Sequence, residues 1–193
     1  GTISANASWS ITNTSYFVID PISVGVGTTL TVTPGVVVKF NGGRSLIVNG
    51  ALRVLGTDSN RVYLTSYRDD TVGGDTNGDG ASVGARGDWR MIQFTDFSND
   101  ATSLIDHAEI RYGGLYDGYG TDYGAITLSS ASPTIQNSSL SNSRYCAITA
   151  DVASFPTLSG NSLTNNDANG ICLYGGTISA NASWSITNTS YFV

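Results

Sequence analysis

One loop of this chain gathers the side chains best suited to bind a metal ion. Asp75, Asn77 and Asp79 alternate along it and Gly80 follows, which is the D-x-N-x-D-G spacing of calcium-binding loops. The bidentate Glu that completes an EF-hand is absent from its place, so further carboxylates must supply oxygens. The predicted Ca²⁺ ligands are Asp69, Asp70, Asp75, Asn77, Asp79 and Asp88. The simpler alternative is an Asp/Gly turn without an ion, because both residues favour turns.

A second polar group surrounds the single histidine, His107. Strand alternation would place Ile105, His107, Glu109 and Arg111 on one face. A catalytic interpretation uses Glu109 or His107 as a base and Arg111 as a charge stabiliser. An outward-facing polar ladder is the simpler interpretation and we favour it, because glycosidase chemistry needs a second carboxyl group that the local sequence lacks. We therefore predict no catalytic residue and no enzyme activity.

Tyrosines between glycines form the third candidate site. They are Tyr112, Tyr116, Tyr119 and Tyr123. Exposed tyrosines on glycine-rich loops can stack on sugar rings or pack between subunits. The alternative is a loop folded against its own domain. Tyr116 and Tyr119 are the predicted contacts to a glycan or to a neighbouring subunit.

The composition limits the classes of function. Charged residues make up 12% of the chain and apolar residues 40%, and the net charge is −6. A chain this acidic does not suit nucleic acid, which is bound through clusters of Lys and Arg. No apolar run approaches the roughly 18 residues of a membrane-spanning helix. We expect an extracellular or cell-surface protein with no membrane span.

The elements that must position these residues are short strands. β-Branched residues dominate, and alternating stretches such as Thr29–Thr33 are separated by Gly, Asn, Asp or Pro. Residues 132–142 align with residues 155–165 at an offset of 23, which puts Ile135 on Leu158 and Leu140 on Leu163. A period of this length is typical of a parallel β-helix, in which stacked turns share one core. Asn at equivalent turns is expected to hydrogen-bond between turns.

The same offset places Ile148 on Ile171 and bears on the two cysteines. If both isoleucines point inward, Cys146 points inward and Cys172 outward. Side chains on opposite faces cannot form a disulfide. We therefore expect no bridge, unless a turn interrupts the alternation.

The first 18 residues return unchanged at the other end. Residues 1–18 are identical to residues 176–193, so residues 1–175 are interpreted as one tandem repeat unit and residues 176–193 as the start of the next copy. Trp184 and Ile186 should then begin a turn as Trp9 and Ile11 do. Long identical repeats are typical of fibres and stalks, because repetition builds length. We see no linker and expect a single domain over residues 1–193.

Several motifs in a fixed order resemble a known family. They are Pro34–Phe40, Leu64–Asp70, Gly73–Gly80, Gly87–Trp89 and His107–Gly114. Together they are similar to bacterial right-handed parallel β-helix repeat proteins of the pectate-lyase-like superfamily, over about residues 28–166. Arg90 follows Trp89 here, whereas that family commonly has a small residue at this position. The resemblance implies a segment of a large secreted or surface protein. Pectate lyases use calcium and an Arg base, but no stretch here matches their catalytic motif.

These observations predict an all-β protein, a right-handed parallel β-helix of seven to nine turns at about 22 residues each. Its predicted function is that of a calcium-stabilised repeat unit of a fibre, sheath or adhesin stalk, with copies of itself as partners. The alternative is a carbohydrate-binding or polysaccharide-degrading (lyase or hydrolase) module.

Overall fold

The chain winds through three parallel β-sheets. The computed structural model describes residues 1–115, 123–178, 181–186 and 189–193, and it assigns strands but no helix to them. Sheet A contains β1 (Thr2–Ile3), β4 (Ile22–Val24), β7 (Ser45–Val48), β10 (Met91–Phe94), β13 (Ile126–Leu128), β16 (Cys146–Ala150), β19 (Ala168–Leu173) and β20 (Ser190–Phe192). Sheet B contains β2 (Ala7–Trp9), β5 (Thr29–Val32), β8 (Ala51–Leu55), β11 (Leu104–Asp106), β14 (Thr134–Gln136) and β17 (Thr157–Ser159). Sheet C contains β3 (Tyr16–Val18), β6 (Val37–Phe40), β9 (Val62–Ser66), β12 (Ala108–Arg111), β15 (Ser139–Ser141) and β18 (Ser162–Thr164).

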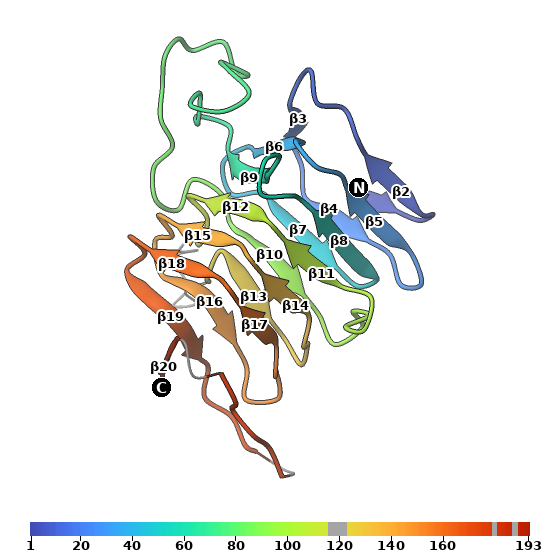
Figure 1. The fold of residues 1–193 in the computed structure, drawn as a ribbon, viewed down its shortest axis with the longest axis vertical. Coiled ribbons are helices and arrows are strands. Elements are labelled where there is room, and N and C mark those ends of the chain that lie inside the picture. Colours follow the sequence, from blue (N-terminus) through green and yellow to red (C-terminus); the bar gives the residue numbers. More distant parts are fainter. Residues whose placement is uncertain (116–122, 179–180, 187–188) are drawn as a thin grey trace.

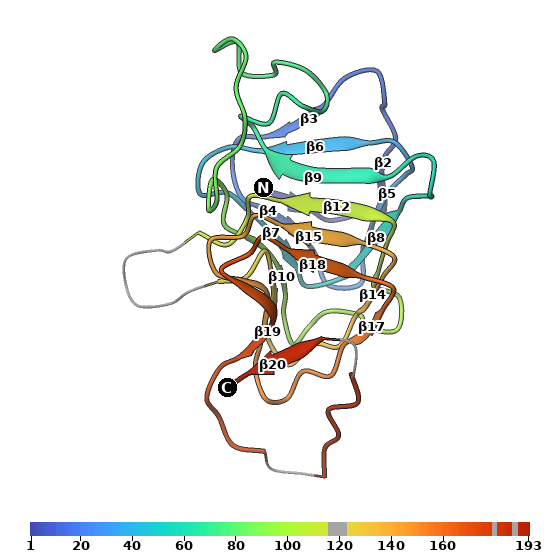
Figure 2. The same cartoon turned by 60° about the vertical axis from the view of Figure 1, so that its left-hand side comes forward.

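Each turn of the solenoid visits sheets A, B and C in that order, so every strand pairs with the strand one turn away (Figures 1 and 2). The described strands make six complete turns, and β19 and β20 extend sheet A beyond them. Counted on sheet A, the described residues contribute eight strands, which agrees with the expected seven to nine turns, although only six of these turns place a strand in all three sheets. Residues 69–88 leave the turn between β9 and β10 as a loop.

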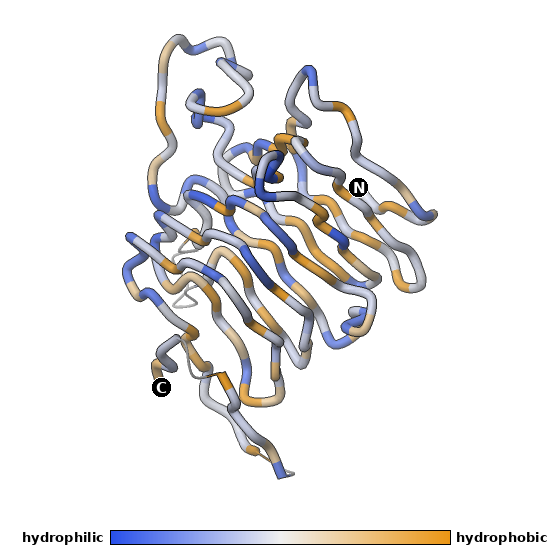
Figure 3. The backbone as a smooth tube through the Cα atoms, in the orientation of Figure 1, coloured by the Kyte–Doolittle hydropathy of each residue, from blue (hydrophilic) through white to orange (hydrophobic). Residues whose placement is uncertain are grey.

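The core is a set of apolar columns that run along the solenoid axis. In sheet C, one column is Val38, Leu64, Ile110, Leu140 and Leu163, each paired with the next. The first four are fully buried, and apolar colour follows the strands of all three sheets in Figure 3. Burying one such side chain contributes about 1.5–3 kcal/mol, so the stacked columns hold the turns together. The predicted pairs Ile135–Leu158, Leu140–Leu163 and Ile148–Ile171 are confirmed.

Corners between the sheets repeat a left-handed backbone conformation. Tyr112, Asn142 and Asn165 occupy equivalent corners with φ of 65°, 58° and 56°. Asn tolerates this region better than most residues, and its amide can bond to the neighbouring turn. The Asn165 side chain donates to Asn142 Oδ1 across the turns, which confirms the expected asparagine stacking.

Cys146 and Cys172 form a disulfide, so the expectation of two unpaired cysteines was wrong. Their Cα atoms lie 6.0 Å apart, within the range that a bridge spans. The error came from assuming regular pairing of β16 with β19. Cys146 pairs with Ala168, but Ile148 pairs with Ile171. The two-residue advance along β16 therefore matches a three-residue advance along β19. Such an irregularity breaks the strict alternation of faces.

The two identical segments lie in different surroundings. Residues 1–18 provide β1, β2 and β3 to all three sheets, whereas the described part of residues 176–193 provides only β20, to sheet A. Trp184 therefore does not repeat the strand position of Trp9, contrary to expectation. The first copy pairs with β4, β5 and β6, which follow it in sequence. Within the described residues the second copy pairs with β19, which precedes it, and residues 176–178 and 181–186 form no strand (Figures 1 and 2).

Candidate metal centre

The aspartate-rich loop, residues 69–88, leaves sheet C at the end of β9 and returns to sheet A at β10. It stands at the N-terminal end of the solenoid, above β9 in Figure 1. Thr65 and Ser66 at the end of β9 are fully buried and anchor its base. The loop is thus an insertion held by a rigid strand.

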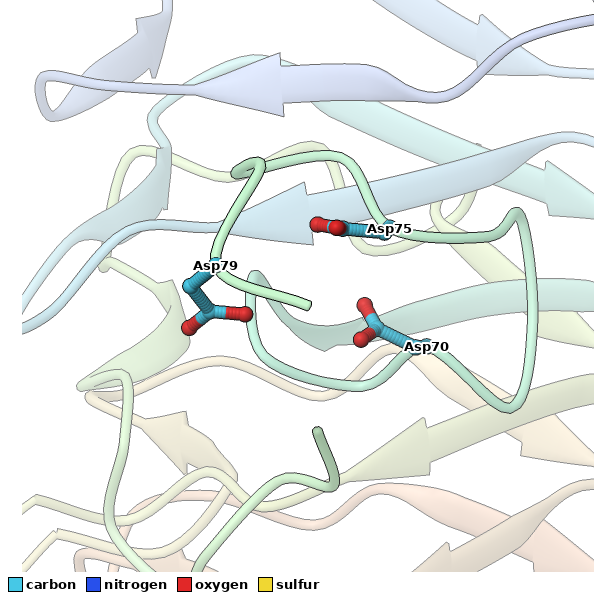
Figure 4. Close-up of side chains that lie close together, drawn as sticks. All are labelled: Asp70, Asp75 and Asp79. Atoms are coloured by element: carbon cyan, nitrogen blue, oxygen red, sulfur yellow. The ribbon is translucent and has the colours of Figure 1, made fainter. Parts of the chain in front are cut away.

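Three carboxylates converge inside this loop. Asp70, Asp75 and Asp79 each offer one oxygen, and these oxygens all lie within 4.8 Å of one another (Figure 4). Asp75 and Asp79 are exposed and Asp70 is half-buried. Carboxylate oxygens are the ligands that Ca²⁺ prefers, so three of the six predicted ligands are brought together.

Hydrogen bonds from the loop itself hold the carboxylates of the cluster in place without a bound ion. Asp75 Oδ1 accepts a hydrogen bond from Gly78 N at 2.6 Å, and Asp75 Oδ2 accepts one from Gly80 N at 3.0 Å. Both glycines have positive φ, of 72° and 86°, which L-residues with side chains rarely adopt. Ser82 N donates to Asp70 Oδ2 at 2.7 Å and Ser82 Oγ to the same oxygen at 3.0 Å. The loop therefore holds its carboxylates close despite their mutual repulsion.

Two oxygens in the loop are buried without a hydrogen-bond donor. They are Asp70 Oδ1 and Asn77 Oδ1. Asn77 lies against the cluster, because its Nδ2 donates to Asp79 Oδ2 at 2.8 Å. Buried acceptors without hydrogen bonds are costly, and a cation would give a further partner to Asp70 Oδ1, whose charged neighbour is the Lys39 ammonium 3.8 Å away, and a first one to Asn77 Oδ1. The residues of the loop thus fit a hard divalent cation such as Ca²⁺, with Asp70, Asp75, Asn77 and Asp79 as its ligands.

Asp69 and Asp88 lie outside the cluster and hold the base of the loop. Asp69 is fully buried and accepts from the Thr65 hydroxyl at 2.7 Å, while Asp88 Oδ2 accepts from Ser66 Oγ at 2.6 Å. Asp88 Oδ2 also accepts from Ala85 N at 2.8 Å. These two predicted ligands act as anchors in this arrangement.

Sequence reasoning missed Lys39, which is fully buried on β6. Its ammonium group donates to the carbonyl of Gly74 and lies 3.8 Å from Asp70 Oδ1. Burial lowers the pKa of Lys39 below its ordinary value, and the nearby carboxylates of Asp70, Asp69 and Asp75 oppose that shift. A charged residue inside the apolar stretch Val36–Phe40 is the signal that could have revealed it.

The family comparison matches half of the chain. Residues 94–191 match the family described as the right-handed beta helix region. The chain belongs to the right-handed β-helix family. No curated protein and no solved structure matches this β-helix.

The second candidate group lies on sheet C of this β-helix. Arg61 Nε pairs with Glu109 Oε1 at 2.9 Å, and Arg111 Nε lies 3.7 Å from Glu109 Oε2. Arg111 Nη1 also lies 3.6 Å from Asp69 Oδ2 at the base of the loop. Of the three residues expected to form a polar ladder, Glu109 and Arg111 thus lie together, joined by Arg61 and not by His107.

The expected placement of Ile105 and His107 on one strand face was wrong. Ile105 is fully buried, whereas His107 sits at a corner with φ of 51° and ends the alternation there. His107 Nδ1 lies 2.7 Å from Asp106 Oδ1, and Nε2 lies 3.0 Å from Asp58 Oδ1. His107 thus contacts two aspartates at the corner between β11 and β12.

The tyrosine-rich segment is described only at its edges. Tyr116 and Tyr119 lie outside the described residues. Tyr112 packs against the core, and the Arg90 guanidinium lies 4.6 Å from the centre of the Tyr123 ring. Within the part of the chain that the structure describes, no helix has the length and apolar character to cross a membrane.

Proposed function

We propose that this β-helix is a structural repeat unit of an extracellular or cell-surface fibre, sheath or adhesin stalk. The observation that carries this function is the repetition of residues 1–18 at 176–193, because the first copy forms a complete turn that bonds to all three sheets of the solenoid. A chain built of such units would extend by adding turns to the same columns. In this proposal the chain has no catalytic role.

The disulfide supports the extracellular location. Disulfides persist in oxidising compartments and are rare in the cytosol. Cys146 and Cys172 join neighbouring turns of sheet A, where a bridge would resist unwinding of the solenoid. The low content of charged residues, 12%, agrees with a surface rich in hydroxyl and amide groups.

Calcium binding is the second part of the proposal. It is supported by two buried oxygens that accept no hydrogen bond, Asp70 Oδ1 and Asn77 Oδ1, beside the carboxylates of Asp75 and Asp79. Bound Ca²⁺ would offset the repulsion among the carboxylates and fix the loop on the solenoid. Isothermal titration of chelator-treated protein with CaCl₂ tests this directly, with saturable uptake of one ion expected. Absence of heat and of any rise in melting temperature would refute it.

Electron microscopy of the native full-length protein tests the structural function. Long filaments of solenoid width are expected. Discrete globular particles under native conditions would contradict a fibre or stalk.

The alternative function, binding or cleavage of a polysaccharide, has one favourable observation. Glu109, Arg61 and Arg111 form a half-buried acid–base cluster on one face of sheet C. Incubation with uronic-acid polymers tests for lyase activity. Release of unsaturated sugar that is lost in Glu109→Gln would favour this alternative.

A further inference from the structure

A buried lysine marks where the aspartate-rich loop lies on the solenoid. Lys39 is the only lysine of the chain, and on β6 it follows Val38, which belongs to the core column of sheet C. Successive side chains of a strand point to opposite faces, so Lys39 lies on the outer face of the sheet. It is nevertheless 0% exposed, as is its partner Thr65 on β9, whereas Thr164 on the same face at β18 is exposed. A segment outside the sheet must therefore cover this face near β6 and β9.

The covering segment is the first part of the loop. The carbonyl oxygen of Gly74 accepts a hydrogen bond from the Lys39 ammonium group, and Asp70 Oδ1 lies 3.8 Å from the same nitrogen. A Cβ added to Gly73 would lie 3.5 Å from Lys39 Cε and 3.2 Å from Val37 Cγ1. The backbone of the loop therefore rests directly on the outer side of β6.

The second part of the loop follows the corners between sheets C and A. A Cβ added to Gly84 would lie 2.4 Å from Cδ2 of Tyr112, at the corner after β12. A Cβ added to Gly87 would lie 2.9 Å from Cδ of Arg144, between β15 and β16. Glycine at both positions lets the backbone pass close to two successive corners, a path that Figure 1 shows beside the ends of β12 and β15.

Arg86 extends these contacts to one further corner. Its Nη2 donates to Asn165 Oδ1 at 2.8 Å and its Nη1 pairs with Asp167 Oδ1, in the connection from β18 to β19. Residues 69–88 lie between β9 and β10 in sequence, yet they contact the solenoid from β6 to this corner. The loop thus runs along the solenoid axis, across turns whose strands pair only with those of adjacent turns.

We propose that the aspartate-rich loop is a strap that opens and closes over sheet C, and that a cation in its carboxylate cluster holds it closed. Asp70, Asp75 and Asp79 belong to the part of the loop that covers Lys39 (Figure 4), so their mutual repulsion favours opening and an ion between them favours closure. At the far end the loop is held by the exposed Arg86 pair, and such pairs are weak. This proposal rests on the proposed calcium binding and deepens it, because calcium would control how firmly the loop ties the turns together.

Acylation of Lys39 measures opening of the loop, because the amine is covered in the closed loop and no other lysine competes. Chelator-treated protein is labelled with an N-hydroxysuccinimide acetate ester at increasing Ca²⁺ concentrations, and peptide mass spectrometry gives the initial rate at Lys39. If calcium binds only the closed loop, this rate should fall by the factor 1 + [Ca²⁺]/Kd, about elevenfold when [Ca²⁺] is ten times the Kd from titration calorimetry. A rate that saturating calcium does not change would overturn the proposal and leave calcium binding intact. Absence of calcium uptake would overturn both.

Urea distinguishes local opening of the loop from unfolding of the whole solenoid. Local opening exposes little surface, so urea below the unfolding transition should change the labelling rate of Lys39 little. A steep rise of the rate with urea would mean that Lys39 is reached only by global unfolding, and this would overturn the proposal.

The far end of the strap is tested with Arg86→Ala and Asp167→Ala. Each removes one partner of the ion pair, so in calcium-free buffer each should speed the labelling of Lys39 by roughly two- to fivefold, and the double variant by no more than either alone. Asp96→Ala, which removes an exposed carboxylate between β10 and β11, is the control and should leave the rate unchanged. Unchanged rates in both anchor variants would overturn the connection along the axis.

Discussion

Lys39 Nζ lies 3.8 Å from Asp70 Oδ1, which places a fully buried ammonium group beside the carboxylates of the aspartate-rich loop. The same nitrogen donates to Gly74 O, so one ammonium group contacts two positions in the first part of the loop. It reduces carboxylate repulsion when no metal is bound, and it repels a divalent ion that enters. Lys39 therefore couples the stability of the loop to its affinity for a cation.

Replacing Lys39 with Met should change these two properties in opposite directions. Without Ca²⁺ the variant should melt at a lower temperature than the wild type, because Asp70 loses its counter-ion. The rise in melting temperature on adding Ca²⁺ should be larger than in the wild type. Arg53→Met on sheet B, which also removes one positive charge, serves as the control and should leave the Ca²⁺ response unchanged. An equal calcium-induced rise in Lys39→Met and wild type would contradict the coupling.

Asp79→Ala and Asp88→Asn should separate metal ligation from anchoring. Asp79 faces the carboxylate cluster, so its removal should abolish the calcium-induced rise in melting temperature with little change in the metal-free protein. Asp88 accepts from Ser66 Oγ and Ala85 N, so its substitution should cost about 1–3 kcal/mol with or without calcium. Scanning calorimetry with EDTA and with CaCl₂ measures both. Retention of the full calcium response in Asp79→Ala would remove this residue from the site.

The sequence was sufficient to predict the contacts between those parts of the fold that repeat from turn to turn. A constant offset of 23 residues gave the pairing of Leu140 with Leu163 and the stacking of Asn142 with Asn165, because stacked turns must place like residues on like positions. The D-x-N-x-D-G spacing likewise predicted that the carboxylates of Asp75 and Asp79 converge, since this depends on neighbours within one loop.

Features set by irregular backbone could not be predicted in this way. The disulfide of Cys146 depends on a register shift between β16 and β19, and the placement of His107 depends on a positive φ at a corner. Asp69 and Asp70 are adjacent in sequence but point to different partners, Thr65 in the core and Ser82 in the loop. A periodic sequence pattern cannot predict these features, because each one depends on tertiary contacts.

Gly73→Ala and Gly74→Ala form a matched pair that tests how the loop packs on the first turn. Both glycines have positive φ, of 68° and 71°, so both variants lose about 1 kcal/mol to backbone strain. A Cβ on Gly73 would also lie 2.2 Å from Ser15 Oγ, whereas one on Gly74 meets nothing within 4 Å. Urea unfolding should therefore show a larger loss of stability for Gly73→Ala. Equal losses would mean that the loop does not rest on Ser15.

The disulfide should be present in the protein as isolated from an oxidising compartment. Alkylation of the denatured protein without reductant is expected to label neither Cys146 nor Cys172, and labelling of both should follow treatment with dithiothreitol. The double variant Cys146→Ser/Cys172→Ser should lose about 2–5 kcal/mol of unfolding free energy. Free thiols in the untreated protein would contradict both the bridge and the support that it gives to an extracellular location.

Asp106 should make stability depend on acidic pH. Burial acts to raise its pKa, but hydrogen bonds from Gln136 and Asn137 and the charge of His107 outweigh burial and lower the pKa below its ordinary value. A carboxyl group with a lower pKa in the folded state stabilises the protein fully above its unfolded pKa of about 3.9, and that stabilisation is lost as the pH falls through the folded value. The wild type should therefore be more stable than Asp106→Asn at pH 7, and the difference in unfolding free energy should shrink below about pH 4. Urea titrations of both proteins across this range measure the difference, and a gap that stays constant would show that the Asp106 contacts do not favour its ionised form.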